Sequence, residues 1–494
     1  MMKHTITILL CIGIIQSSVF SQQDMLYYPV QMHHDLNKFR DALEYAHPGF
    51  YSHLSKEEFE IHFTTLISES SKPLRKIEFY KLVLKLVAHL HDGHTRTFAL
   101  NHLRSYIGKQ KLLPFHCYIK DERIFVSRYI GNGEVRDGAE IISINGHNTN
   151  YILSKLMEYY SGDGQSKGPI YYRFSSPFNS FYRIFPLIFG FNESYELVIK
   201  NHLSKGTKKF KVNSLEEGTF RENELKKYGD NLHPAGMAEI LAIDAYNFHI
   251  DQENNYALMK IHRFFKDDFY EDENIYFNFY KEAFDKISKN KIQNLIIDIR
   301  GNGGGKGSNV GKLLQYFIST PLQPTWEISL NGDEHYFSNI TQDQLDLNAY
   351  FGLKESTSGK MIVTRSDNIT ELQTFKPIAE NSFNGEIYVL IDGGTLSAAS
   401  MAAGLLREHT NAIFVGAETG GYSGMSNGIR QLSIRGDHTD VGINFPLLHS
   451  EFNVNPHLRD RGVTPDYTVD ASIRDILEGK DVVLKFTLEL IKQD

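Results

Sequence analysis

The chain has 494 residues, which is too long for one compact hydrophobic core, so two or three domains are expected. Its apolar and charged fractions, 41% and 23%, are those of an ordinary globular protein. A net charge of −8 and the lack of a long basic run argue against nucleic acid as the main partner.

Residues 1–21 have the pattern of a secretory signal peptide. Lys3 supplies a short positive region, the apolar run Ile6–Ile15 follows, and small residues near Ser21 favour cleavage. A buried N-terminal helix is the alternative. The run is too short for a stable membrane span, so we expect an exported protein, periplasmic or secreted. Because Cys11 leaves with the signal, Cys117 remains without a disulfide partner and is expected to be a buried small hydrophobe.

Three patterns then follow along the chain. Residues 22–104 carry apolar positions at helical spacing and predict an N-terminal helical domain. Residues 105–215 change to short β-runs with turns, among them a predicted hairpin around Asn145-Gly146. Within them lies an insertion rich in Phe and Tyr, residues 171–191. Residues 225–485 alternate strands with helices, as in βαβ units with a buried sheet. The predicted apolar strands are 255–264, 294–300, 386–392 and 412–418, and helices are predicted at 308–317 and 397–409.

A glycine-rich loop follows one of these strands, in "NLIIDIRGNGGGKGSN", residues 294–309. The P-loop pattern fails because Gly307 stands where a Ser or Thr should follow Lys306. The dinucleotide pattern fails at its third glycine. Neither nucleotide pattern fits, so no nucleotide is predicted. We expect no other cofactor and no metal. Bare backbone amides at the end of a strand can also form an oxyanion hole.

A serine, Ser397, begins a helix of small residues after the strand and turn "IDGGTL". A serine raised above a sheet at a helix N-terminus is placed as a nucleophile would be. The simpler interpretation is an ordinary helix N-cap.

Three histidines lie close together in "HLHDGHTRTF", residues 89–98. His89 and His91 are two residues apart and so lie on different sides of a helix, which makes a metal site a weak prediction. The helix is expected to end around Asp92-Gly93, so His94 lies in the turn that follows and is free to reach a site formed by another part of the chain.

Together these segments resemble the S41 serine peptidases, the tail-specific or C-terminal processing proteases. The resemblance runs through Asp298–Gly305, Thr395–Ala399, Val415–Gly421 and Gly462–Asp466, in the family's order. It implies a multidomain α/β protein: an N-terminal helical region, a PDZ-like β-rich domain at 105–215, and an α/β protease domain of the ClpP/crotonase type at 225–485.

The sequence departs from the Ser–Lys branch of that family, because Tyr422 stands where the lysine is expected. The turn Asp92–Thr95 is similar to the histidine motif of the Ser–His, tricorn-like branch. That resemblance implies Ser397 as nucleophile, His94 as general base and an acid before the C-terminal motif. Asp460 is the candidate acid, and Glu451 is the alternative.

We therefore expect a serine endopeptidase in which backbone amides of Gly304 and Ala398 hold the oxyanion. Its partners would be peptide or protein substrates, recognised at their C-termini if the PDZ-like domain captures them by strand addition. The alternative is an inactive protein of the same fold that binds peptides or an apolar ligand.

Overall fold

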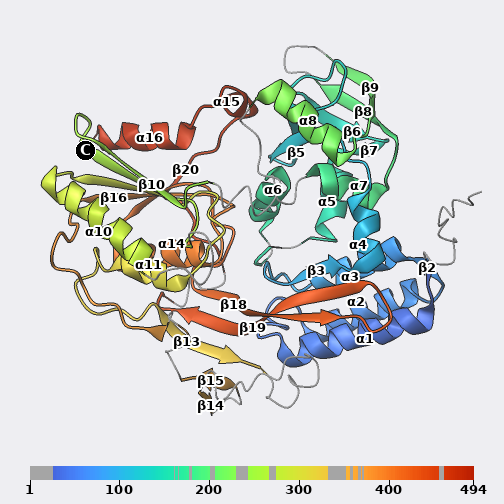
Figure 1. Ribbon diagram of the computed structural model, residues 1–494, viewed down its shortest axis with the longest axis horizontal. Coiled ribbons are helices and arrows are strands. Elements are labelled where there is room, and N and C mark those ends of the chain that lie inside the picture. Colours follow the sequence, from blue (N-terminus) through green and yellow to red (C-terminus); the bar gives the residue numbers. More distant parts are fainter. Residues whose placement is uncertain are drawn as a thin grey trace, which may run out of the picture.

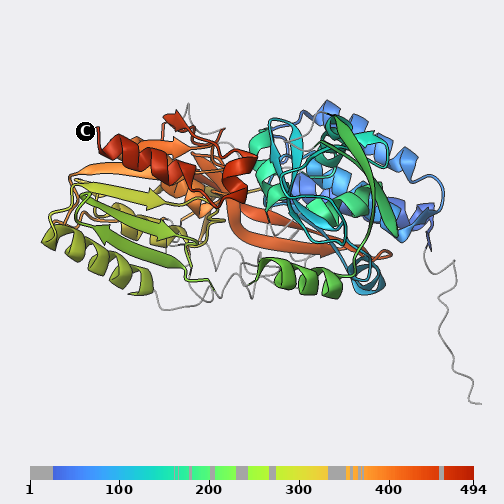
Figure 2. The same ribbon diagram turned by 90° about the horizontal axis from the view of Figure 1, so that it is seen from above.

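The computed structural model describes residues 26–160, 162–164, 166–176, 181–200, 206–229, 243–265, 274–331, 352–356, 360–364, 369, 372–455 and 461–493. The predicted signal peptide lies outside these residues. Figure 1 shows an α/β half on the left and, on the right, a β-rich middle region above N-terminal helices. The view from above in Figure 2 shows the two halves side by side. A long hairpin, β18–β19, runs beneath both of them (Figure 1).

The N-terminal region is helical, as its periodicity predicts. Helix α2 begins with a capping box in which Ser55 and Glu58 each bond to the other's backbone, and this fixes its start. Helix α3 ends at Ala88, earlier than the Asp92-Gly93 end that the sequence suggested, so the His94 turn is preceded by an irregular stretch. The elements are β1 (Leu26–Tyr27), α1 (Pro29–Ala46), α2 (Lys56–Glu69), β2 (Leu74–Arg75), α3 (Lys76–Ala88), β3 (Arg96–Ala99) and α4 (Asn101–Gly108).

The middle region contains one mainly antiparallel sheet in the order β4-β5-β6-β8-β9, with β7 paired to β6. The predicted hairpin is confirmed: β6 and β7 flank Asn145 and Gly146, whose φ angles of 49° and 81° are those of a tight hairpin turn. The insertion rich in Phe and Tyr contributes to two helices, α6 and α7. The elements are β4 (Phe115–Lys120), β5 (Arg123–Tyr129), β6 (Glu140–Ile144), β7 (His147–Asn148), α5 (Thr149–Met157), α6 (Lys167–Ser175), α7 (Phe181–Phe189), β8 (Ser194–Lys200), β9 (Thr207–Asn213) and α8 (Glu217–Tyr228).

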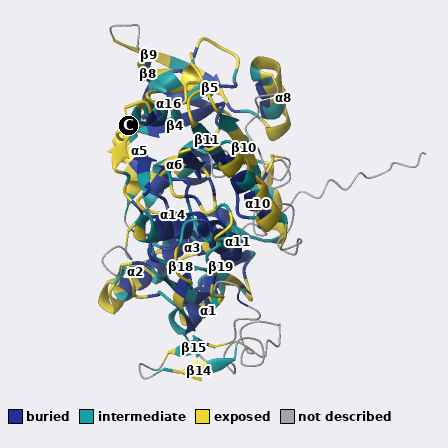
Figure 3. Ribbon diagram, turned by 90° about the vertical axis from the view of Figure 1, so that its left-hand side faces the viewer, coloured by how far each residue is buried: buried dark blue, intermediate teal, exposed yellow. Residues whose placement is uncertain are grey.

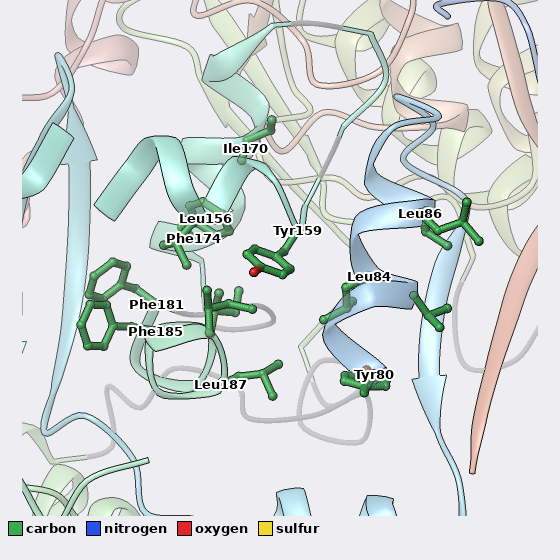
Figure 4. Packing of buried hydrophobic residues seen from close by; sticks show 14 of the residues in the cluster. Tyr80, Leu84, Leu86, Leu156, Tyr159, Ile170, Phe174, Phe181, Phe185 and Leu187 are labelled. Carbon is green, nitrogen blue, oxygen red and sulfur yellow. The ribbon is translucent and has the colours of Figure 1, made fainter. Parts of the chain in front are cut away.

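The N-terminal helices and the middle region share one hydrophobic core. Tyr80 and Leu84 of α3 and residues of α5, α6 and α7 belong to the same buried cluster, which Figure 4 shows from close by. Burial of this much apolar surface makes the two regions one packed unit. Consequently the loop after α5 is held close to the end of α3, where His94 lies.

The α/β half is built on a second sheet, in the order β10-β11-β12-β16-β17-β20. The four predicted apolar strands form its parallel centre, and their interior residues are buried. Both predicted helices, α11 and α14, are present, and buried residues are concentrated along α14 in Figure 3. The elements are β10 (Tyr246–Asp251), β11 (Tyr256–Ile261), α10 (Asn274–Lys289), β12 (Asn294–Asp298), α11 (Gly307–Leu314), β16 (Glu386–Ile391), α14 (Ala398–His409), β17 (Ile413–Gly416), β20 (Tyr467–Thr468), α15 (Ile473–Leu477) and α16 (Val482–Ile491).

A third sheet joins the two halves. Its order is β14-β15-β13-β19-β18, and the N-terminal strand β3 pairs antiparallel with β19, from Val441↔Ala99 to Asn444↔Arg96. The pairing of β18 with β19 is irregular between Ser426 and Ile429, where β18 passes the His94 turn. The elements are β13 (Thr325–Leu330), β14 (Leu353–Glu355), β15 (Met361–Val363), β18 (Met425–Arg435) and β19 (Val441–Phe452).

Two sequence-based expectations concern burial and membranes. Cys117 is 3% exposed in β4, which confirms it as a buried small hydrophobe. Within the described residues, no helix combines the length and the apolar character that crossing a bilayer requires.

Candidate active site

Ser397 lies at the sharp junction between β16 and α14. Its φ of 52° and ψ of −124° are strained for a residue with a side chain, and such strain gathers at active sites. The side chain makes no capping hydrogen bond to α14, so the simple N-cap interpretation is not what the structure shows. A serine on a strained strand-to-helix turn presents its hydroxyl outward, above the end of the sheet.

His94 lies in the turn between α3 and β3. The Oδ1 atom of Asp92 accepts hydrogen bonds from the backbone N–H groups of His94 (2.7 Å) and Thr95 (2.9 Å). These bonds fix the backbone of the turn. The histidine side chain is 18% exposed, so its ring is held mostly inside the protein.

Ser397 and His94 both lie beside Gly428, on the irregular part of β18, around the point where a β-carbon would project. A methyl group at Gly428 would lie 2.8 Å from His94 Nε2 and 3.1 Å from Ser397 Oγ. The absence of a side chain there leaves the space in which the two groups face each other. Irregular strand pairing is common next to active sites, where it changes the direction in which a side chain points. The chain thus brings together two predicted residues that are about 300 positions apart.

Asp92 is the centre of a buried polar network. Its Oδ2 atom accepts a hydrogen bond from Asn427 Nδ2 (2.6 Å) and lies 3.3 Å from His47 Nε2. Burial by itself raises the pKa of Asp92, but the bonds from His47 and Asn427 and the charge of His94 outweigh it, so the pKa lies well below its ordinary value. Asn427 also contacts His449 Nδ1 at 2.8 Å, which extends the network to β19.

A second carboxylate, Asp163, approaches His94 from the loop after α5. Asp163 Oδ1 lies 4.0 Å from His94 Nδ1 and accepts a hydrogen bond from the Gly93 N–H at 2.7 Å. Asp92, His94 and Asp163 have ligand atoms within 4.8 Å of one another, so they are the described group nearest the site that could hold a cation. Both oxygens of Asp92 are already hydrogen-bonded by protein groups, which explains its position without a metal.

The other two histidines of the cluster do not converge on His94. The ring of His89 stacks on His62 with centroids 3.2 Å apart, and the ring of His91 lies edge-on to His53 at 6.5 Å. The weak sequence signal for a three-histidine metal site therefore has no geometric support.

The glycine-rich loop is tied to the serine turn. The Leu396 N–H donates to the Asn302 carbonyl oxygen at 2.9 Å, and the Gly301 N–H donates to Asp392 Oδ1 at 2.8 Å. A methyl group on Gly304, whose φ is 103°, would lie 2.7 Å from Ser397 Cβ. A glycine is therefore needed at position 304, because Ser397 and the backbone on either side of it occupy the space that a side chain would take.

The two predicted oxyanion donors differ in their hydrogen bonding. The Gly304 N–H donates to Asn302 Oδ1 at 2.8 Å, so it is occupied in this conformation. Within the described residues the N–H of Ala398, in the first turn of α14, donates to no acceptor. Ala398 is thus the better placed of the two to bind an oxyanion.

Tyr422, at the position where a lysine was expected, packs against His53. Their rings stack at 5.5 Å, and Tyr422 Oη is hydrogen-bonded to His53 Nε2. Beside them is a small cavity of about 10 Å³, room for roughly one water molecule. The cavity is lined by Gly49, Ser52, His53, Leu90, His91, Asp92, Tyr422, Met425, Asn427 and His449.

The predicted acid is not tested by this geometry. Asp460 lies outside the described residues, and Glu451 lies 3.8 Å from His449 Nε2. Sequence reasoning did not select Asp163 or Gly428. The only local signals were an aspartate between two glycines, "GDG", and a glycine inside a strand.

Asp298 and Arg300 form a bidentate ion pair, and Arg300 also binds Asp481. These ion pairs give Asp298 and Arg300 a structural role in the loop. Helix α6 of the middle region contacts both this loop and the serine turn, because a methyl group on Gly301 or Gly394 would lie 3.0 Å or 2.4 Å from the Tyr172 side chain.

Comparison with known proteins identifies a peptidase domain in the chain. Residues 255–469 match the model of "Peptidase family S41", a segment that contains Ser397 and the glycine-rich loop. The chain is thus a hydrolase of the serine peptidase class. More particularly, the matched segment, residues 255–469, is an S41 peptidase domain. No curated protein matches the sequence.

Solved structures share the fold over nearly the whole chain. Mature CPAF has 14% identity and a TM-score of 0.62, with 94% of this chain and 98% of that chain covered. Mature CPAF complexed with lactacystin has 13% identity and a TM-score of 0.60, with 94% and 99% covered. At this identity the likeness shows a common multidomain α/β fold, including the regions before the peptidase domain.

Proposed function

We propose that this protein is an exported serine endopeptidase that hydrolyses peptide bonds with Ser397 as nucleophile and His94 as general base. The observation that carries the proposal is the placement of Ser397 Oγ and His94 Nε2 around Gly428. Nucleophilic catalysis by serine requires a base within reach, and these are the two groups that the fold brings to one point.

The reaction would be acyl transfer. Ser397 attacks the scissile carbonyl while His94 takes its proton and then gives it to the leaving amine. The Ala398 N–H, strengthened by the N-terminus of α14, stabilises the oxyanion. The Gly304 N–H can act as the second donor to the oxyanion only after its hydrogen bond to Asn302 is broken.

The signal-like N-terminus is the basis for proposing exported substrates. The resemblance of residues 105–215 to a PDZ domain is the basis for proposing that the C-terminus of a substrate is recognised. One edge of that sheet, β4, is covered by α6, since the Ile119 N–H donates to Ser175 Oγ at 2.9 Å. Strand addition at this edge therefore requires α6 to move.

The test is cleavage of a mixed peptide library by the purified chain beside S397A and H94A. Exposed Ser154 and His102 provide matched controls, S154A and H102A. We expect cleavage by the wild type and both controls, and its loss in S397A and H94A. Cleavage that survives H94A would exclude His94 as the base. No cleavage by the wild type, with an apolar ligand co-purifying, would instead favour an inactive binding protein.

A further inference from the structure

We propose that Asp163 is the positioning residue of this site: its carboxylate receives the Nδ1–H of His94 and so holds the ring with Nε2 toward Ser397. This rests on the proposed function of Ser397 and His94. Asp163 Oδ1 is 4.0 Å from His94 Nδ1, which is buried and has no hydrogen-bond partner among the residues that the structure describes. A buried ring nitrogen without a partner is costly, and a carboxylate beside it is the natural acceptor.

The loop that carries Asp163 is fastened to the histidine turn at two points. The Gly93 N–H donates to Asp163 Oδ1 at 2.7 Å, and the Gly164 N–H donates to the His91 carbonyl at 2.9 Å. One bond is accepted by the carboxylate itself, and the other is donated by the backbone of the next residue. Asp163 therefore moves together with His94 rather than independently of it.

The shared core explains how a loop of the middle region reaches this turn. Tyr159, just before the loop, lies in the same buried cluster as Leu84 and Leu86 of α3 (Figure 4). Packing of α3 against the middle region thus sets the distance between the two segments. No sequence motif marks this contact, because it is made by tertiary packing.

Asp92, the other carboxylate near His94, cannot accept the His94 Nδ1–H in the same way. Asp92 Oδ1 accepts the backbone N–H groups of His94 and Thr95, and Asp92 Oδ2 is engaged by Asn427 and His47. Among the described residues, Asp163 accepts only the Gly93 N–H, so lone pairs remain for His94. Asp92 therefore fixes the backbone of the histidine turn, and Asp163 is the carboxylate that remains available to the His94 ring.

A distance of 4.0 Å is about 1 Å longer than a direct hydrogen bond, and such bonds are often long before substrate binds. Burial raises the pKa of Asp163, and the charge of His94 acts against that rise. By the same interaction, an ionised Asp163 stabilises the imidazolium that forms during acyl transfer. The other charged groups that act on Asp163 here are Asp92, Arg96 and Arg173, with His47 behind Asp92.

The experiment compares D163N with D460N and E451Q, the two acids chosen from the sequence. Asparagine keeps an oxygen for the Gly93 N–H but loses the charge, so the loop stays in place. D137N is the matched control, because Asp137 also accepts a backbone N–H, that of Tyr129 at 2.7 Å, in the same region. We expect kcat to fall about 10²- to 10⁴-fold in D163N with KM little changed. The acid limb of the kcat/KM profile should move to lower pH.

A second measurement does not depend on catalysis. In ¹⁵N-histidine NMR spectra, with H94Q used for assignment, the His94 Nδ1–H resonance should be present in the wild type and shifted or lost in D163N. If the wild type cleaves nothing but this resonance responds to D163N, the proposed function fails and the contact stands. A D163N variant with nearly full activity and an unchanged resonance would overturn the inference, as would a large loss confined to D460N.

Discussion

Asn427 Nδ2 donates a hydrogen bond to Asp92 Oδ2 at 2.6 Å, and this bond fastens the irregular part of β18 to the histidine turn. The next residue on β18, Gly428, is consequently held against the reacting groups. A side chain at this position would enter the space between His94 and Ser397.

The substitution G428A should therefore damage catalysis more than stability. The new methyl group would lie 2.8 Å from His94 Nε2, closer than van der Waals contact allows, so the ring must move. We expect kcat/KM to fall by about 10²-fold, as a displacement of about 1 Å can cause. Peptide cleavage and the melting temperature would be measured together.

The control for that change is G218A. Gly218 is in α8, and nothing lies within 4 Å of a methyl group placed there. Activity should be unchanged. Normal activity of G428A would mean that His94 and Ser397 do not use this space.

The strained backbone of Ser397 predicts that the variants S397G and S397A differ in stability. In S397G the positive φ costs little, whereas S397A keeps the strain, and both lack the hydroxyl. We expect S397G to be more stable than S397A by about 1 kcal/mol in urea unfolding. Equal stabilities would show that the junction is not strained in solution.

Asp392 predicts a pH dependence of stability. Burial raises its pKa in the folded protein to about 6, above the roughly 3.9 of an unfolded chain. Ionisation therefore opposes folding: the penalty is absent below about pH 4, grows as the pH rises to 6, and is complete above it.

The variant D392N removes that penalty while keeping an oxygen for the N–H groups of Gly301 and Gly394. It should be more stable than the wild type by about 1–3 kcal/mol at pH 7.5 and equal to it at pH 4. Thermal unfolding across this range would measure the difference. A D392N variant that loses stability at pH 7.5 would show that the charge itself is needed.

Cys117 should be inert to thiol reagents in the folded protein. Burial raises the pKa of its thiol well above the ordinary value, so little reactive thiolate forms. In a C11S background at pH 8, we expect no labelling by iodoacetamide without denaturant and complete labelling in urea. Rapid labelling of the native protein would mean that β4 opens readily.

Much of the fold could be predicted because it is encoded locally. The parallel strands are continuous apolar runs, and Asn145-Gly146 is a residue pair that tight hairpin turns favour. Both could therefore be found from short segments of sequence. Ser397 and the glycine-rich loop were found for the same reason. The end of α3 was misplaced because helix periodicity does not mark where the last turn stops.

The remaining parts of the site depend on contacts between distant segments. The nearness of Asp163 to His94 comes from packing of α3 on the middle region, and Gly428 matters because β18 is irregular there. The hydrogen bond of Gly304 to Asn302 depends on how the loop folds back on itself. None of these leaves a pattern within a short stretch of sequence.

The pairing of β3 with β19 has a consequence for the order of events during synthesis. Ala99 needs Val441 as its partner, and Asp92 needs Asn427, so the segment that completes the histidine turn leaves the ribosome long after the turn itself. Ser397, the proposed nucleophile, is also made late, just before α14. The residues of the proposed site therefore come together only after most of the chain has been synthesised.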